Sequence, residues 1–195
     1  LISAANFSRL LGKTKAELRY VRTAKEIKSA ILAYLYDIEN GFFYSSLEAK
    51  EKNNDNQVDL ATFFSLFNFG VLSADDERLL KMSKIIERDL KSDTGLIYRM
   101  NAGDDKSSFL ATVWYLRWVI AKAKNEADLK PVIKFTEWLM DEEKGQRLLS
   151  GEDITDEKMI AEPLIWRQTE FISVIIDYLN KLEEFGICRA CNPVK

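Results

Sequence analysis

The chain has 195 residues, 47% of them apolar, and a formal net charge of −3. With only 3 Pro and 8 Gly, this composition argues against a disordered or all-β chain and is sufficient for the core of one large domain. The acidic balance and the absence of a basic run argue against nucleic-acid binding, and no apolar stretch is long enough to span a membrane.

The sequence contains no His, and its two cysteines, Cys188 and Cys191, form a single C-x-x-C pair. This pair cannot supply the four ligands of a tetrahedral zinc site, so neither a metal nor a cofactor is expected. Without His, Ser-His and Cys-His nucleophiles are excluded, and acid–base chemistry would use carboxylates, Lys or Tyr. The few cysteines and the absence of a visible signal peptide favour a cytoplasmic location.

The N-terminal region is expected to be helical from its first residue. A first helical segment ends near Gly12, and a long helix follows over 14–36, with Thr14 and Glu17 in the pattern of a capping box. Because the chain starts inside a helical pattern and without Met, we expect it to be a fragment of a longer protein.

The middle of the chain alternates short polar connections with helices. The aromatic stretch 42–44 is expected to be extended, and the charged, Asn-rich run 50–56 is expected to be an exposed loop. The stretch 58–68 is apolar on most faces and predicts a buried helix. Ser73 is the expected N-cap of the following amphipathic helix over 75–91.

The C-terminal half continues with three more helices. The stretch 107–124 is apolar nearly all round, and 125–141 is amphipathic, with Pro131 expected in its first turns because a deeper Pro would break the helix. A polar loop then leads to a final helix over 166–185.

Two kinds of helix alternate along the sequence. Those apolar on most faces are 58–68, 107–124 and 166–182, and the amphipathic ones are 14–36, 75–91 and 127–141. This alternation is typical of the inner and outer helices of a toroid built from helical hairpins. The sequence therefore predicts an all-α fold with about seven helical segments, and the lack of a fixed-length repeat makes a solenoid less favoured.

The connection 147–166 has the residue types of a sugar site. It contains Glu152 among small residues and ends in Pro163 and Trp166, where the last helix is expected to start. A carboxylate can activate water and an indole can stack on a pyranose ring. The alternative is an acidic, solvated connection whose Trp fills the core.

Six short motifs follow one another in a recognisable order. They are Val58-Asp59-Leu60-Ala61-Thr62, Gly95-Leu96-Ile97-Tyr98-Arg99-Met100, Phe109 with Val113-Trp114-Tyr115-Leu116, Phe135-Thr136-Glu137-Trp138, Leu148-Leu149-Ser150-Gly151-Glu152 and Pro163-Leu164-Ile165-Trp166. In this order and spacing, the chain resembles the C-terminal half of the catalytic domain of glycoside hydrolase family 15, the glucoamylase and glucodextranase group.

The resemblance implies about half of an (α/α)6 barrel and the hydrolysis of α-glucosidic bonds with inversion. By position, Glu152 matches the catalytic base, Arg99 an Arg that hydrogen-bonds sugar hydroxyls, and Trp114 and Trp166 aromatic residues of the glucose pocket. The implied partner is an α-glucan or oligosaccharide substrate. The general acid would lie outside this chain, so the fragment alone would be inactive.

The sequence departs from the family pattern in the base motif and beside it. The family has Glu-Gln directly after Leu-Ser, whereas here Gly151 follows Ser150, and Asp153 follows Glu152. In addition, Met100 replaces a Tyr of the family, and Arg167-Gln168 replaces Ser-His. Either one residue is inserted and Glu152 keeps the role of base, or Gly151 has replaced the base and the site is inactive. Ile154 aligns with a Val or Ile of the family only if one residue is inserted, which favours the insertion.

Each residue also has a structural interpretation. Arg99 could pair with an acidic helix end, Trp114 could belong to the core, and Glu152 could be a solvated loop residue. Asp59 is expected to be a helix N-terminal charge rather than a ligand residue.

Two other classes of function remain open. Helical toroids of this type also occur as regulatory domains, as in phosphorylase kinase regulatory subunits, where the domain would sense a carbohydrate without cleaving it. The third possibility is a helical scaffold that binds a protein partner. An exposed inner-helix face could also support a homodimer.

Overall fold

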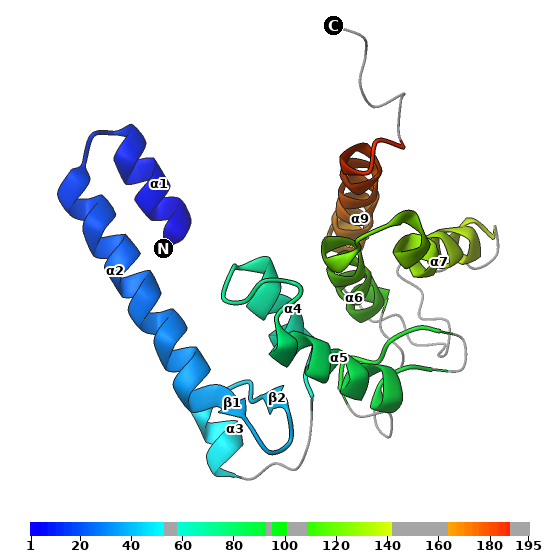
Figure 1. Cartoon of the computed structure of the whole chain (residues 1–195), viewed down its shortest axis with the longest axis horizontal. Coiled ribbons are helices and arrows are strands. Elements are labelled where there is room, and N and C mark those ends of the chain that lie inside the picture. The colour runs from blue at the N-terminus through cyan, green and yellow to red at the C-terminus, as the bar shows by residue number, and fades with distance from the viewer. Residues whose placement is uncertain (53–57, 93–94, 101–108, 142–163, 188–195) are drawn as a thin grey trace, which may run out of the picture. The chain divides into compact units, whose positions relative to one another are not determined.

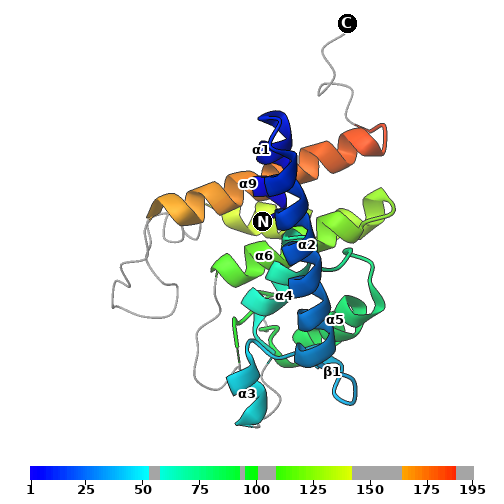
Figure 2. The same ribbon diagram turned by 90° about the vertical axis from the view of Figure 1, so that its left-hand side faces the viewer.

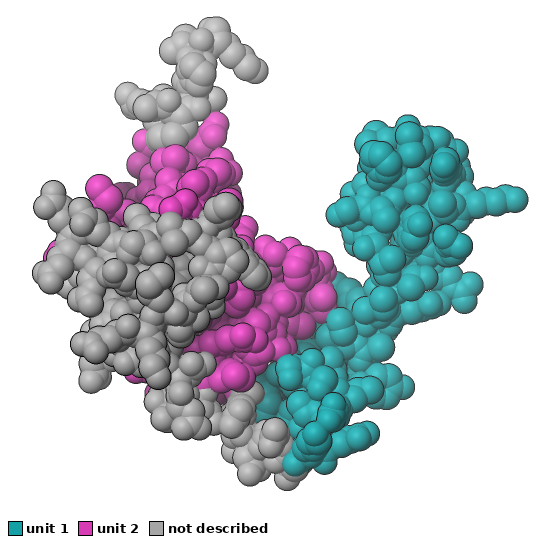
Figure 3. Space-filling view, turned by 180° about the vertical axis from the view of Figure 1, so that it is seen from behind, with its two compact units in different colours: residues 1–57 teal, residues 58–195 magenta. Residues whose placement is uncertain are grey.

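A computed structural model describes residues 1–52, 58–92, 95–100, 109–141 and 164–187, with the backbone alone described for 164–167. The described chain divides into two compact units, 1–57 and 58–195, which are coloured separately in Figure 3. Helices dominate both units, and the one sheet of the described residues has two short strands, so the all-α prediction is confirmed at the level of fold class.

The first unit is a helical hairpin followed by a small β-hairpin (Figure 1). Its elements are α1 (Ile2–Leu10), α2 (Thr14–Ala30), the π-helical turn η1 (Ile31–Leu35), β1 (Tyr36–Asp37), β2 (Phe42–Phe43) and α3 (Leu47–Glu51). Gly12, at φ 68°, allows the chain to reverse between α1 and α2. The predicted capping box of the long helix is wrong: the N-cap is Lys13, which makes no side-chain cap hydrogen bond.

The β-hairpin is held by its turn as well as by its strands. Tyr36 pairs with Phe43 and Asp37 with Phe42 in an antiparallel register. The Asp37 carboxylate accepts hydrogen bonds from the backbone N–H of Glu39 and of Asn40, each at 3.0 Å. Phe42 and Phe43 are buried, which explains why this aromatic stretch is extended as predicted.

The described residues of the second unit form five helices and one 3-10 turn. They are α4 (Leu60–Asn68), α5 (Glu77–Asp89), α6 (Phe109–Lys122), the 3-10 turn η2 (Glu126–Leu129), α7 (Lys130–Met140) and α9 (Leu164–Glu184). The bounds agree with the predicted helices to within a few residues. Pro131 lies in the first turn of α7, as expected, because its missing N–H has no helical partner there.

The N-cap predicted for α5 is wrong. The cap is Asp76, whose carboxylate accepts a hydrogen bond from the backbone N–H of Arg78 at 3.0 Å. Ser73 belongs instead to the preceding turn, where its carbonyl accepts from the N–H of Asp76. The helix therefore starts later than the polar residues of the sequence suggested.

Helix α6 is the centre of the second unit. It packs against α4, α7 and α9, and Figure 2 shows α6 between α4 and α9. Most of its side chains are buried, and four less buried ones share one face of the helix: Leu110, Trp114, Arg117 and Ala121. Its Trp118 is fully buried, contacts Phe63 of α4 and donates its indole N–H to the carbonyl of Ala74 at 2.9 Å.

Side-chain contacts show that α4, α6 and α9 run in the same direction. Phe64, in the middle of α4, stacks on Trp114 in the first half of α6. Further along, Phe67 of α4, Ala121 of α6 and Lys181 of α9 line one hollow. Helix α5 runs in the opposite direction to α6: Trp118 reaches the residues that precede α5, whereas the Tyr115 hydroxyl donates to Glu87 near its end.

Candidate functional site

The N-terminal ends of α4, α6 and α9 lie at the same end of the second unit, because the three helices are parallel. The N-terminal end of a helix carries a partial positive charge. The chain enters these helices from 53–57, 101–108 and 142–163, all outside the described residues. Two of the predicted site residues, Arg99 and Trp114, are fully described here.

Arg99 is attached to the N-terminus of α4. Its carbonyl accepts a hydrogen bond from the backbone N–H of Leu60 at 3.0 Å. Its guanidinium Nε lies 3.5 Å from Oδ1 of Asp59, the N-cap of α4. About half of the Arg99 side chain stays exposed, at 52%, against 17% for Asp59. Arg99 therefore does pair with an acidic helix end, and its remaining donors can still reach a ligand.

A tight turn carries the chain from α5 to Arg99. The backbone N–H of Gly95, at φ 86°, donates to the carbonyl of Ser92, and an isolated β-bridge joins Lys91 to Ile97. The N–H of Ile97 then donates to the Thr112 hydroxyl of α6 at 2.9 Å. This hydrogen bond fixes the segment 95–100 against the start of α6.

Asp59 has the structural role that the sequence favoured. Its carboxylate accepts a hydrogen bond from the backbone N–H of Ala61 at 2.9 Å, which satisfies one of the first N–H groups of α4. The same carboxylate orients Arg99. Asp59 thus links a helix cap to a predicted substrate-binding side chain.

Trp114 belongs partly to the core. Its ring stacks on Phe64, with ring centroids 5.1 Å apart and an interplanar angle of 11°. Its indole Nε1 is buried and has no hydrogen-bond partner among the described residues. A buried N–H donor without an acceptor is unfavourable.

The other two predicted site residues are not described at side-chain level. Glu152, the predicted base, lies outside the described residues. Trp166 is the third residue of α9, and only its backbone is described. Trp166 lies in the first turn of α9, and Glu152 precedes this helix in the sequence.

Arg117 joins the middle of α6 to α9. Its guanidinium lies 2.8 Å from Asp177 and 3.3 Å from Glu170, and its side chain is only 20% exposed. The guanidinium carbon also lies 5.4 Å from the centroid of the Phe64 ring. Arg117 was not predicted from the sequence, although a single charged residue within the apolar stretch of α6 could have indicated a buried ion pair.

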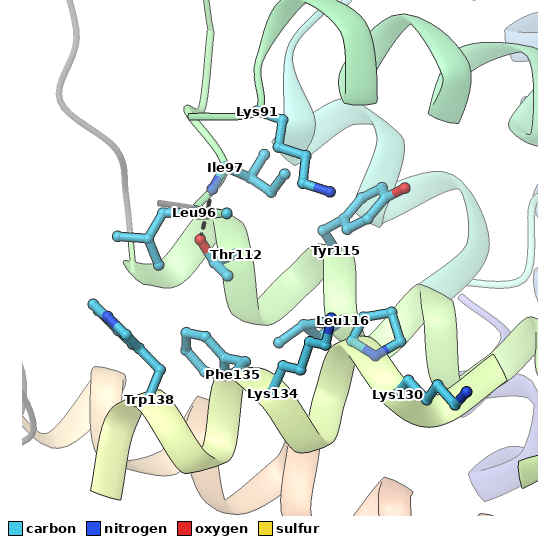
Figure 4. A pocket seen from close by; sticks show the side chains of 12 residues that line it. Lys91, Leu96, Ile97, Thr112, Tyr115, Leu116, Lys130, Lys134, Phe135 and Trp138 are labelled. Carbon is cyan, nitrogen blue, oxygen red and sulfur yellow. Dashed lines mark hydrogen bonds between the residues drawn. The ribbon is translucent and has the colours of Figure 1, made fainter. Parts of the chain in front are cut away.

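A pocket of about 450 Å³ opens between the end of α5, α6 and α7 (Figure 4). Its residues come from three stretches and are Lys91, Gly95, Leu96, Ile97, Thr112, Tyr115, Leu116, Lys130, Pro131, Lys134, Phe135 and Trp138. No single stretch of sequence contains enough of them to indicate a pocket, which explains why sequence analysis missed it.

Tyr115 forms part of one wall of this pocket and has a strongly perturbed pKa. Burial, the hydrogen bond from its hydroxyl to Glu87 and the charge of Glu87 raise the pKa of the Tyr115 phenol far above its ordinary value. Tyr115 therefore stays neutral throughout the physiological range and acts as a hydrogen-bond donor.

Comparisons with protein-family models, with curated proteins and with solved structures found no match. Within the described ranges, no three His, Cys, Asp or Glu side chains are grouped so that they could hold a metal ion. None of the described helices combines the length and apolar character that a membrane span requires.

Proposed function

We propose that the chain is part of an inverting, exo-acting α-glucosidase that hydrolyses α-glucans or oligosaccharides, with Glu152 as the general base. The observation that carries the proposal is the parallel direction of α4, α6 and α9. It brings Asp59 and Arg99 to the end of the unit at which α9 begins, and Glu152 precedes α9 in the sequence. An inner ring of parallel helices is also what the (α/α)6 barrel of the resembled family would require.

The electrostatics of this end suit a catalytic base. The base must be ionised to take a proton from water, and helix N-termini stabilise negative charge. In the inverting reaction, Glu152 would remove a proton from a water molecule while the water oxygen attacks the anomeric carbon. A second carboxyl group, on the opposite face of the sugar, would protonate the departing glycosidic oxygen. The resemblance places this acid outside the chain.

Arg99 and the two Trp residues would hold the non-reducing-end glucose. The guanidinium of Arg99 is oriented by Asp59 at 3.5 Å and keeps donors free for sugar hydroxyls. The buried Nε1 of Trp114 offers a further donor. Trp166 would supply a flat apolar face for the pyranose ring.

The test is glucose release by the natural full-length protein from maltose, maltooligosaccharides, isomaltose and trehalose. We expect Glu152→Gln to lower the rate by about 10²–10⁴-fold, because Gln cannot accept the proton. Glu157→Gln, an isosteric change in the same segment, is the control and should keep the activity. The first-formed glucose should be the β-anomer, seen by NMR, and an α-anomer would contradict inversion.

A carbohydrate-sensing domain is the alternative, and the sequence changes around Glu152 favour it. Gly151 and Asp153 depart from the family's base motif. In that case, calorimetry should detect maltose binding by the folded full-length protein without any glucose release. Neither release nor binding would favour the scaffold function. The homodimer through an exposed inner-helix face stays a prediction.

A further inference from the structure

We propose that the pocket between α5, α6 and α7 is a binding site for a small amphipathic anion, a carboxylate or phosphate monoester on an apolar body. This site is separate from the proposed glucosidase site and does not depend on it. A pocket of about 450 Å³ is within the range of small-molecule sites.

The walls and floor of the pocket are mainly apolar. Leu96, Ile97, Leu116 and Phe135 are all at most 7% exposed, and they form the inner surface. Figure 4 shows the Trp138 ring at one end of the hollow, next to Phe135. The two rings stack with centroids 5.8 Å apart, which holds the indole as a rigid wall. An apolar or aromatic body would replace water on this surface favourably.

The described charged residues of the pocket are all basic. Lys91, Lys130 and Lys134 line it, and none of its described lining residues is Asp or Glu. In the described part of the chain, none of these three ammonium groups makes an ion pair. Figure 4 shows the side chains of Lys91 and Lys134 on opposite sides of the hollow, with Lys130 further out. An anionic head group between Lys91 and Lys134 would relieve their mutual repulsion.

The polar side chains in the interior of the pocket already form hydrogen bonds within the protein. The Tyr115 hydroxyl donates to Glu87, and the Thr112 hydroxyl accepts from the backbone N–H of Ile97. A sugar would therefore find few partners for its hydroxyls on these walls. A ligand whose polarity is confined to one charged end fits this distribution better than a polyol.

The experiment uses four ligands whose longest chain has eight carbon atoms: octanoate, octyl phosphate, neutral 1-octanol and cationic octyltrimethylammonium. Isothermal titration calorimetry on the full chain should show binding of at least one of the two anions, at least tenfold tighter than octanol, and no binding of the cation. Comparison of octanoate with octyl phosphate decides between a carboxylate and a phosphate head group. Binding of octanol as tight as that of both anions, or binding of no anion, would overturn the proposal.

Variants locate the site. The double change Lys91→Glu and Lys134→Glu should weaken anion binding at least tenfold. The control is Lys81→Glu with Lys84→Glu on α5, which makes the same charge change at two exposed lysines outside the pocket. Trp138→Phe should remove the ligand-induced change in tryptophan fluorescence while calorimetry still detects binding. Equal loss in the control pair would show an effect of net charge alone and contradict the proposal.

Discussion

At the scale of the residue, Asp59 combines two roles that are measurable separately. Its carboxylate caps α4 through the N–H of Ala61 at 2.9 Å, and it pairs with Arg99 at 3.5 Å. The cap is the stronger contribution to stability, because Arg99 is half exposed and exposed ion pairs contribute little.

We expect Asp59→Ala to lower the free energy of unfolding by about 1 kcal/mol through loss of the cap. Asp59→Asn keeps an acceptor at the N-cap and should cost only a few tenths of a kcal/mol. Urea denaturation followed by circular dichroism measures both values. Equal losses in the two variants would mean that the charge facing Arg99, and not the cap, is what stabilises this helix end.

Tyr115 makes the stability of the protein sensitive to alkaline pH. Its phenol has an ordinary pKa of about 10 in the unfolded chain, and the folded protein raises this pKa through burial and through Glu87. Above about pH 10, the unfolded chain therefore loses the Tyr115 proton while the native state keeps it. The contribution of Tyr115 to stability is complete below pH 10 and is lost as pH rises.

At neutral pH, we expect Tyr115→Phe to cost about 1 kcal/mol through loss of the hydrogen bond to Glu87. Between pH 9 and 11, the wild-type protein should lose more stability than the variant, so the difference between them should shrink. Urea denaturation at pH 9, 10 and 11 measures this difference. A difference that stays constant or grows over this range would contradict the raised pKa.

At the scale of the element, Arg117 determines how α6 holds α9. It contacts Asp177 and Glu170, which are separated by two turns of α9. Because its side chain is 20% exposed, these contacts are less weakened by solvent than those of surface pairs. Its ring contact with Phe64 also connects this ion-pair group to α4.

We expect Arg117→Ala to destabilise the protein by about 1–2 kcal/mol and to increase hydrogen exchange in α9 more than in α5. The matched control is Arg88→Ala, which removes an Arg that pairs with Asp89 but is 73% exposed. The control should change stability by less than about 0.5 kcal/mol. Unchanged exchange in α9 in the Arg117 variant would show that apolar packing alone holds this helix.

At the scale of the whole molecule, the two units differ in how well they bury their own apolar side chains. In the first unit, α2 has no buried residue and α1 has only Ala5 and Ser8. Leu10 and Ile38 are each 80% exposed. The second unit has a core of fully buried side chains that includes Leu60, Phe63, Leu79, Met82, Val113 and Trp118.

We expect the segment 58–195, produced alone, to unfold cooperatively on heating, because its core is complete enough to support a two-state transition. The segment 1–57 alone should show a broad, non-cooperative loss of helicity, since helices without tertiary packing are marginal in water. Circular dichroism melts of the two segments provide the test. A sharp transition in 1–57 would contradict the expectation.

The hydrophobic pattern of the sequence was enough to predict the main helices of the second unit and which of them are apolar on most faces. These properties depend on residues a few positions apart, so the pattern of 107–124 was enough to predict a buried α6. The placement of Pro131 and the presence of Asp59 at a helix N-terminus were predicted from local chemistry in the same way. The N-cap of α5 was not, because the turn that starts at Ser73 delays the helix to Asp76.

Which side chains meet depends on the tertiary structure. Arg99 lies 40 residues beyond Asp59 in the chain, and the two are joined because the turn after α5 returns to the start of α4. The pocket lined by Lys91, Lys134 and Trp138 likewise depends on the packing of α7 against α6. Periodicity gives the inward face of each helix but not its direction or its neighbours, since these depend on the path of the loops and on the fit of side chains from distant segments.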